Sequence, residues 1–122
     1  MQTIDLNQVI EQLLVLLNDG RARAGLPTLS VSATLTVSAQ TRALLLASSD
    51  SLQEVSGPET DIRIVGCSTP KEVAQRAFIS LYNRDDSVVA GENAWANTTL
   101  VGMDAQQSRS GGVYICLMFE AQ

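Results

Sequence analysis

The segment Val113 to Phe119, close to the C-terminus, most constrains what this chain can fold into. All seven of its residues are apolar, so both faces of the strand that they predict must be buried. A strand that is buried on both faces needs a layer of helices on each side of its sheet. The segment therefore predicts a three-layer α/β/α sandwich of the α+β class.

Three helices can supply these layers. Apolar residues at helical spacing predict the first over about residues 6–24, with a capping box at Asp5 and Gln8 and a stop at Gly25 and Pro27. Thr69, Pro70 and Glu72 predict the start of another helix that runs to about Tyr82. Between these two, a helix capped by Ser30 or Ser32 is expected to place Gln40 and Arg42 at the surface and these residues inside: Leu35, Ala39, Ala43, Leu45 and Leu46.

Two further short strands are expected, at 62–65 and at 99–103. The polar stretches 48–60, 83–97 and 104–112 are expected to be loops, with one helical turn allowed in the second. The strands at 99–103 and 113–119 would then pair in antiparallel fashion across their connecting loop. The pattern predicts a small antiparallel central sheet, and 122 residues are enough for a single domain spanning 1–122.

Composition excludes several functions. The chain contains no histidine, which removes Ser-His-Asp and Cys-His nucleophile systems and any imidazole zinc site. The net charge of −5 and the 4% aromatic content argue against a nucleic-acid partner. No apolar run reaches the roughly 20 residues of a membrane span, and no signal peptide is expected from the N-terminal residues. Neither a Walker loop nor a dinucleotide fingerprint is present, so no cofactor is expected.

The two cysteines, Cys67 and Cys116, allow two interpretations. A disulfide between them would close a loop of about 50 residues and stabilise the fold by roughly 4 kcal/mol in the chain-entropy estimate. The alternative is two buried thiols that pack as small apolar side chains. A bridge would favour an exported protein, because thiols in the cytosol stay reduced.

The order of several motifs resembles the CAP superfamily, which includes cysteine-rich secretory proteins, antigen 5, plant pathogenesis-related proteins and bacterial SCP-like proteins. The run from Asn18 through Arg21-Ala22 to Gly25-Leu26 and Leu29 is similar to the family's N-x-x-R-A-x-x-G-L-x-x-L. Ala39-Gln40, Gly66 to Val73 and Gly111 to Tyr114 resemble later family motifs in the same order. The resemblance implies an α-β-α sandwich and an extracellular or cell-surface location.

The chain departs from this family pattern in the central cavity. The resemblance implies two histidines and two glutamates there, and the histidines would fall near residues 49–53 and 84–89, where this chain has none. The family's G-E-N-I strand corresponds to Asp61-Ile62-Arg63-Ile64. Gly91-Glu92-Asn93 imitates that motif but follows the S-T-P helix, so it is interpreted as a look-alike in a loop.

Glu54, Asp61 and Glu92 are the candidate binding residues of the cavity, with Glu59 beside them. Converging carboxylates could run acid/base chemistry or hold a hard cation such as Ca²⁺. Thirteen acidic residues on one domain are mostly surface, however, and their spacing matches no known metal motif. No residue is therefore assigned a catalytic role, and no metal is assigned.

Two functions from different classes follow. The first is a non-catalytic binding module for a lipid, a peptide or a protein, with an apolar cleft between the first helix, the third helix and the loops. The second is a hydrolase that uses carboxylates alone, which requires two carboxyl groups roughly 5–9 Å apart. The missing histidines favour binding. A third function, a scaffolding surface within an assembly, cannot be distinguished from the binding module by sequence. The sequence also does not indicate an oligomeric state.

Overall fold

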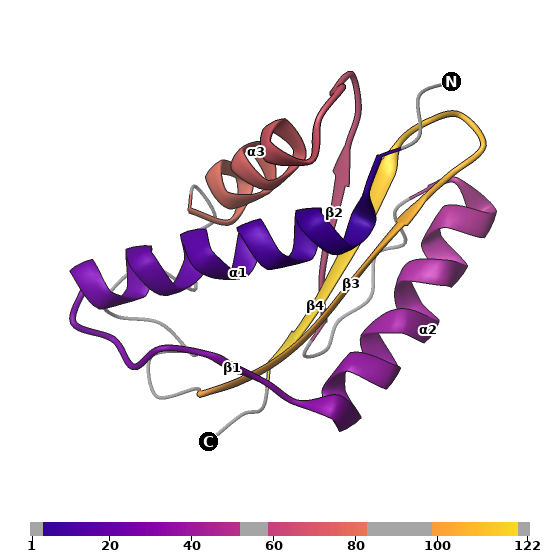
Figure 1. Ribbon diagram of the computed structural model, residues 1–122. Coiled ribbons are helices and arrows are strands. Elements are labelled where there is room, and N and C mark those ends of the chain that lie inside the picture. Colours follow the sequence, from indigo (N-terminus) through magenta and orange to yellow (C-terminus); the bar gives the residue numbers. More distant parts are fainter. Residues whose placement is uncertain (1–3, 52–58, 83–98, 120–122) are drawn as a thin grey trace.

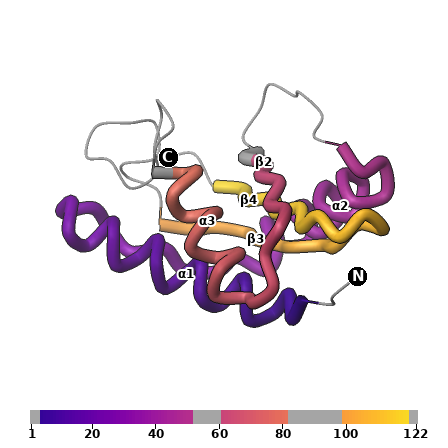
Figure 2. The backbone as a smooth tube through the Cα atoms, turned by 90° about the horizontal axis from the view of Figure 1, so that it is seen from above, coloured from indigo at the N-terminus to yellow at the C-terminus, as the bar shows by residue number. Residues whose placement is uncertain are grey.

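In the part of the chain that the structure describes, the fold consists of three helices and four strands. A computed structural model describes residues 4–51, 59–82 and 99–119. In chain order the elements are α1 (Leu6–Arg23), β1 (Ser30–Val31), α2 (Ala33–Ser49), β2 (Glu59–Ile64), α3 (Pro70–Tyr82), β3 (Leu100–Gln107) and β4 (Val113–Phe119). Helices α1 and α3 cover one face of the sheet and α2 covers the other (Figure 1; Figure 2). The predicted three-layer α+β sandwich is confirmed.

The sheet has the strand order β1-β3-β4-β2. Strand β4 pairs in antiparallel fashion with both β2 and β3, whereas β1 pairs in parallel with β3. The expected antiparallel pairing is confirmed for β2, β3 and β4, and the short parallel strand β1 makes the sheet mixed. Sequence patterning does not reveal β1 because it has two residues and no apolar alternation. Hydrogen bonds from the Ser30 amide to the Thr99 carbonyl, 2.7 Å, and from the Ser32 amide to the Val101 carbonyl, 2.9 Å, hold it in place.

Strand β4 is buried on both faces, as its composition predicts. Val113, Ile115, Leu117 and Phe119 join the main core beneath α1 and α3. On the opposite face Cys116 and Met118 pack against α2, through Ala39 and Ala43. The small side chains on α2 let this helix lie close to the strands.

The connection after α1 explains the N-x-x-R motif in physical terms. Asn18 donates from Nδ2 to the Leu29 carbonyl, 3.0 Å, and accepts from the Leu29 amide, 2.6 Å. Arg21 is fully buried and donates from Nε to the Pro27 carbonyl, 2.8 Å. Gly25 has φ = +76°, a conformation that favours glycine. These contacts fix the connector that carries the chain from α1 into β1.

The helix starts follow their predicted caps. The Asp5 carboxylate accepts from the Gln8 amide, 3.3 Å, and the Thr69 hydroxyl accepts from the Glu72 amide, 3.2 Å. Of the two candidate caps for α2, Ser32 accepts from the Leu35 amide, 3.3 Å, while Ser30 lies in β1. Short polar side chains satisfy amides that have no partner within the helix.

Several element boundaries and the position of the Leu45 side chain differ from the sequence prediction. Strand β3 continues to Gln107 and β2 begins at Glu59, so parts of two expected loops are strand, and α2 continues to Ser49. β3 alternates inward Met103 and Ala105 with polar residues, and its pairing with β4 overrides the low apolar content. Leu45, which was expected inside, is 48% exposed.

Gly102 sets the distance between α2 and the sheet. A Cβ at this position would collide with the backbone of Leu35 and Thr36, in the first turn of α2. Any larger residue would therefore push the start of the helix off β3. This close approach places the buried face of α2 directly on the central strands.

The cysteines are both thiols. Cys67 packs against the core on the α1–α3 side, whereas Cys116 is buried on the α2 side of the sheet. A disulfide would have to cross the sheet, so the bridged alternative is not the one that the structure adopts. In the part of the chain that the structure describes, no helix is long and apolar enough to cross a membrane.

Candidate functional site

Asp61 is the one candidate cavity residue whose surroundings are described. It lies on β2, opposite Cys116 of β4, and its carboxylate faces α2. Arg42 of α2 donates to Asp61 Oδ2 from Nη2, 2.8 Å, and from Nε, 3.2 Å. Each side chain is only 13% exposed. The guanidinium neutralises the carboxylate, so Asp61 does not offer an uncompensated charge to a hard cation.

The position of Arg42 differs from the sequence prediction, which placed it at the surface beside Gln40. Gln40 is exposed as expected. Arg42 precedes the inward-facing Ala43, and its long aliphatic stem lets the guanidinium reach β2 along the side of the helix. The pair is therefore formed by residues that are 19 positions apart, which a helical pattern does not reveal.

The other two candidates, Glu54 and Glu92, lie outside the described residues, as does the Gly91-Glu92-Asn93 segment. Their convergence with Asp61 stays a prediction. Within residues 4–51, 59–82 and 99–119, no three His, Cys, Asp or Glu side chains are grouped so that they could hold a metal ion.

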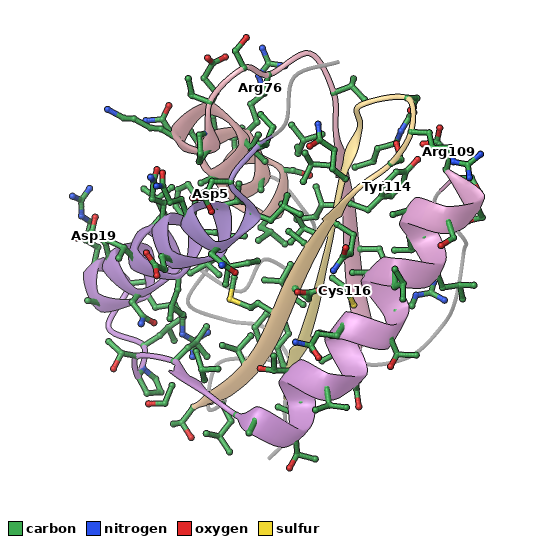
Figure 3. All side chains as sticks on the ribbon, turned by 45° about the vertical axis from the view of Figure 1, so that its right-hand side comes forward. Asp5, Asp19, Arg76, Arg109, Tyr114 and Cys116 are labelled. Carbon is green, nitrogen blue, oxygen red and sulfur yellow. The ribbon has the colours of Figure 1, made fainter. Side chains whose placement is uncertain are left out.

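A second polar cluster, which the sequence did not predict, joins the end of α2 to the β3–β4 turn. The buried Tyr114 hydroxyl donates to Asp50 Oδ1, 2.9 Å, and Asp50 follows α2 with φ = +51°. Figure 3 shows Tyr114 at the β3–β4 hairpin, near α2. Hydrogen bonds from Ser110, Ser108 and Tyr114 lower the pKa of Asp50. Burial, followed by the bond to Asp50, raises the pKa of Tyr114. Arg63 lies 5.9 Å from the centroid of the Tyr114 ring. The cluster fixes α2 to the hairpin.

Beside this cluster, α2 and the end of β3 enclose a hollow of about 400 Å³. Its walls combine amide, hydroxyl and guanidinium groups with the apolar Leu44 and Ala47, and the remaining lining residues are Ser48 and Gln106–Arg109. Such walls resemble ordinary solvated surface more than a site that recognises an apolar ligand.

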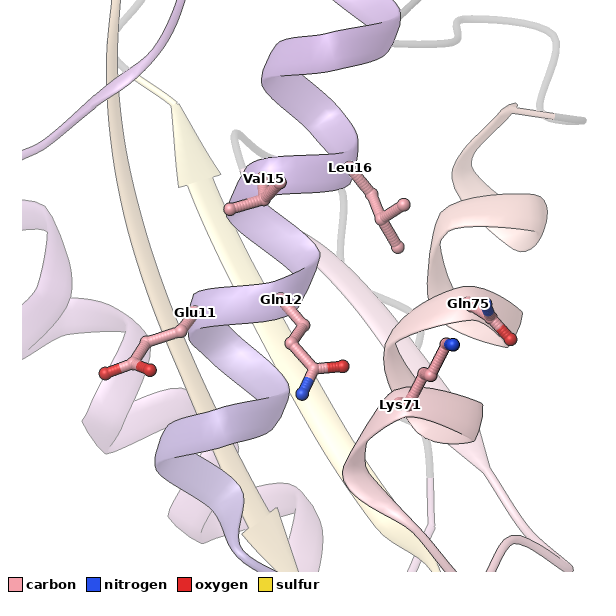
Figure 4. A pocket seen from close by; sticks show the side chains of 6 residues that line it. All are labelled: Glu11, Gln12, Val15, Leu16, Lys71 and Gln75. Carbon is pink, nitrogen blue, oxygen red and sulfur yellow. The ribbon is translucent and has the colours of Figure 1, made fainter.

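A different kind of hollow lies between α1 and α3. This groove of about 370 Å³, the α1–α3 groove, is lined by Glu11, Gln12, Val15, Leu16, Lys71 and Gln75. Gln12 and Leu16 extend from α1 towards α3, and Lys71 and Gln75 border the groove from α3 (Figure 4). Its volume is at the lower end of the range for small-molecule sites.

The spacing of the helix residues explains why the α1–α3 groove is apolar but open. Val9, Leu13 and Leu17 point into the core and are fully buried, whereas Val15 is 68% exposed and Leu16 is half-buried. From α3, the groove is lined by Lys71 and Gln75. The apolar side chains of the groove therefore come from α1.

Lys71 is the only lysine of the chain and forms no hydrogen bond or ion pair with a described residue. Its ammonium group is exposed in the first turn of α3, as the sequence predicts. A cation at the rim of an apolar groove suits a ligand with an anionic end.

Comparison with known proteins identifies the fold. The sequence profile of the cysteine-rich secretory protein family, CAP, matches residues 14–119. The chain belongs to the CAP family. The search of curated proteins found no match to this chain by sequence.

Several solved structures share this CAP fold at low sequence identity. An outer surface protein from Borrelia burgdorferi has a TM-score of 0.71 and 13% identity, with all of both chains covered. The hookworm platelet inhibitor has a TM-score of 0.62 and 16% identity, covering 92% of this chain and 68% of the inhibitor. NaASP2, solved with Zn²⁺, has a TM-score of 0.65 and 12% identity, covering 92% and 78% of the two chains. At these identities the likeness concerns the fold alone.

Proposed function

We propose that this CAP domain is a non-catalytic binding module that holds an apolar ligand with an anionic end in the α1–α3 groove. The observation that supports the proposal is the groove itself, with Val15 and Leu16 on one wall and the ammonium group of Lys71 at its rim. The groove lies between the first and third helices, where a ligand-binding member of this fold would be expected to have its cleft. A fatty acid has the matching chemistry, and peptides or proteins are the other occupants to be tested.

The energetics of such binding come from the exposed part of the groove. Each CH₂ group of a ligand that leaves water contributes about 0.8 kcal/mol. Val15 is 68% exposed, so part of its own apolar surface would also be removed from water when a ligand binds. An ion pair at the solvated rim would add roughly 0–1 kcal/mol, so Lys71 would orient the ligand more than it would hold it.

The alternative of a carboxylate-dependent hydrolase has less support. Such an enzyme needs one carboxyl group to act as acid or nucleophile, yet Asp61 is engaged by Arg42 on a largely buried face. Because CAP family members are typically secreted or displayed on a surface, we also propose an extracellular or cell-surface location. The match to the family over residues 14–119 supports our further proposal of a single domain spanning 1–122.

The proposal is tested by titrating the protein with cis-parinaric acid, a fluorescent fatty acid. Saturable binding is expected, and Val15→Glu should weaken it at least tenfold because it places a charge in the groove. Lys71→Gln should weaken binding of the acid by a few-fold at most and leave binding of a neutral alkyl alcohol unchanged.

Val65→Glu is the matched control, because Val65 is 50% exposed and does not line the groove. This variant should bind as the unmodified chain does. Absence of saturable binding, or equal losses for Val15→Glu and Val65→Glu, would contradict the proposal.

A further inference from the structure

Three polar side chains meet in the α1–α3 groove. Gln12 comes from α1, and Lys71 and Gln75 come from α3. Figure 4 shows the Gln12 carboxamide and the Lys71 ammonium group on facing sides of the groove, with Gln75 beside Lys71. Within the part of the chain that the structure describes, none of the three forms a hydrogen bond or an ion pair. Their N–H donors are therefore available to a ligand that brings acceptor oxygens.

Helical spacing divides the groove into a polar and an apolar section. On α3, Lys71 and Gln75 are four residues apart and so lie on one side of the helix. On α1, Gln12 is followed one turn later by Val15 and Leu16, which supply the apolar wall. A ligand with a polar head and an alkyl chain matches this order of groups.

The number and type of the donors indicate which head group fits. A carboxylate brings one charge and two oxygens, and the planar fork of arginine is the side chain that matches it best. No arginine is among the described residues that line the groove. A phosphate monoester carries about −1.5 to −2 charges at pH 7 and three acceptor oxygens. Three separate donor side chains, one of them a lysine, suit the phosphate better.

We propose that the α1–α3 groove selects ligands that end in a phosphate monoester, which is held by Lys71, Gln12 and Gln75 while the alkyl chain lies on the apolar wall of α1. This inference rests on the proposed function, because it names the head group of the ligand in the same groove. Glu11 is the one carboxylate among the described lining residues. It is exposed, and Figure 4 shows its carboxylate directed away from Gln12 and Lys71.

The charges around the groove support this choice of ligand. The chain has a net charge of −5, and two of its arginines are neutralised by carboxylates, in the pairs Arg23–Asp19 and Arg42–Asp61. Lys71 has no such partner among the described residues, so its charge can act on a bound anion. Because the rim of the groove is solvated, the expected effect is a several-fold preference and not an absolute requirement.

Displacement of cis-parinaric acid by dodecyl phosphate, dodecyl sulfate and dodecanoate tests the preference, because the three ligands share one alkyl chain. Dodecyl phosphate should bind at least fivefold more tightly than dodecanoate at pH 7.5. At pH 5 its affinity relative to dodecyl sulfate should fall at least threefold, since the phosphate loses a charge near pH 6 and the sulfate keeps one charge throughout. Equal affinities for the phosphate and dodecanoate, or a phosphate-to-sulfate ratio that ignores pH, would overturn the proposal.

Substitutions test the three side chains. The double variant Gln12→Leu/Gln75→Leu removes both carboxamides at similar side-chain size, so it should bind dodecanoate but lose most of the preference for the phosphate. Lys71→Gln should reduce the same preference. Gln40→Leu is the matched control, because Gln40 is exposed on α2, on the other side of the sheet, and this variant should keep the preference in full. Thermal unfolding followed by circular dichroism checks that the variants fold. A double variant that keeps the preference would contradict the assignment.

Inorganic phosphate separates a lipid-like ligand from a free ion. At millimolar concentration it should not displace cis-parinaric acid, because an ion without an alkyl chain gains no apolar contact. Displacement by inorganic phosphate as readily as by dodecyl phosphate would overturn the proposal and make the groove a free-phosphate site. Saturable binding of cis-parinaric acid without any phosphate preference would overturn this inference alone, whereas absence of binding by every alkyl ligand would overturn the proposed function as well.

Discussion

Replacement of Gly102 by alanine tests how α2 is seated on the sheet. The added Cβ would collide with backbone atoms of Leu35 and Thr36, and backbone atoms cannot rotate away as a flexible side chain can. The helix start is also held to β3 by the bond from the Ser32 amide to the Val101 carbonyl, 2.9 Å. The helix can therefore retreat only by weakening that bond.

The expected cost combines two effects. Overpacking of a tight site costs about 1–3 kcal/mol, and a weakened backbone hydrogen bond costs about 1 kcal/mol. Gly102→Ala should therefore lower the free energy of unfolding by about 2–4 kcal/mol. For a domain of this size each kcal/mol corresponds to about 4 °C, so the melting temperature should fall by about 8–16 °C.

Gly112→Ala is the matched control, because its added Cβ would be 3.4 Å from the nearest atom, Val65 Cγ1. That distance is an ordinary contact, so this variant should stay within about 1 kcal/mol of the unmodified chain. Urea denaturation followed by circular dichroism measures both variants. If Gly102→Ala loses no more stability than Gly112→Ala, the close approach of α2 to β3 is not what fixes this helix.

Three further predictions concern stability and thiol chemistry. Because the pKa of Asp50 is lowered in the folded protein, its contribution to stability is complete above about pH 4 and is lost as the pH falls through the lowered value. The urea midpoint should therefore fall more steeply between pH 7 and pH 2 for the unmodified chain than for Asp50→Asn. Parallel curves for the two proteins would refute this. Arg21→Leu should lower the unfolding free energy by about 2–4 kcal/mol, measured by urea denaturation, because it removes the bond to the Pro27 carbonyl from a buried site. Dithiothreitol should leave the melting temperature unchanged, because both cysteines are thiols. A lower melting temperature after reduction would show a disulfide. Ellman's reagent should modify Cys67 faster than the buried Cys116.

The parts of the fold that follow local rules were predictable from the sequence. The caps at Asp5 and Thr69 depend on residues three positions apart, and the burial of β4 depends on its own composition. The full length of β3 was not predictable, because its polar residues Gln106 and Gln107 join the sheet only through pairing with β4. Strand β1 was missed for a related reason, since two residues carry no pattern.

Some features of the candidate sites were likewise predictable from the sequence, and others were not. A cleft between the first helix, the third helix and the loops was expected of a binding module, whereas the residues that line the groove depend on how the two helices pack against each other. Arg42 was expected in solvent because a helical pattern gives the direction of a side chain and not the reach of its guanidinium group. The contact between Tyr114 and Asp50 joins residues 64 positions apart, and no local signal in either segment indicates it.

The most direct test of the account is a map of ligand contacts on the labelled protein. Proton–nitrogen NMR spectra recorded during titration with a saturated fatty acid should show saturable shifts in residues 11–16 of α1 and 71–79 of α3. The amides of α2 should stay unshifted. Absence of saturable shifts, or shifts confined to α2 and the β3–β4 turn, would contradict the claim that the α1–α3 groove is the binding site.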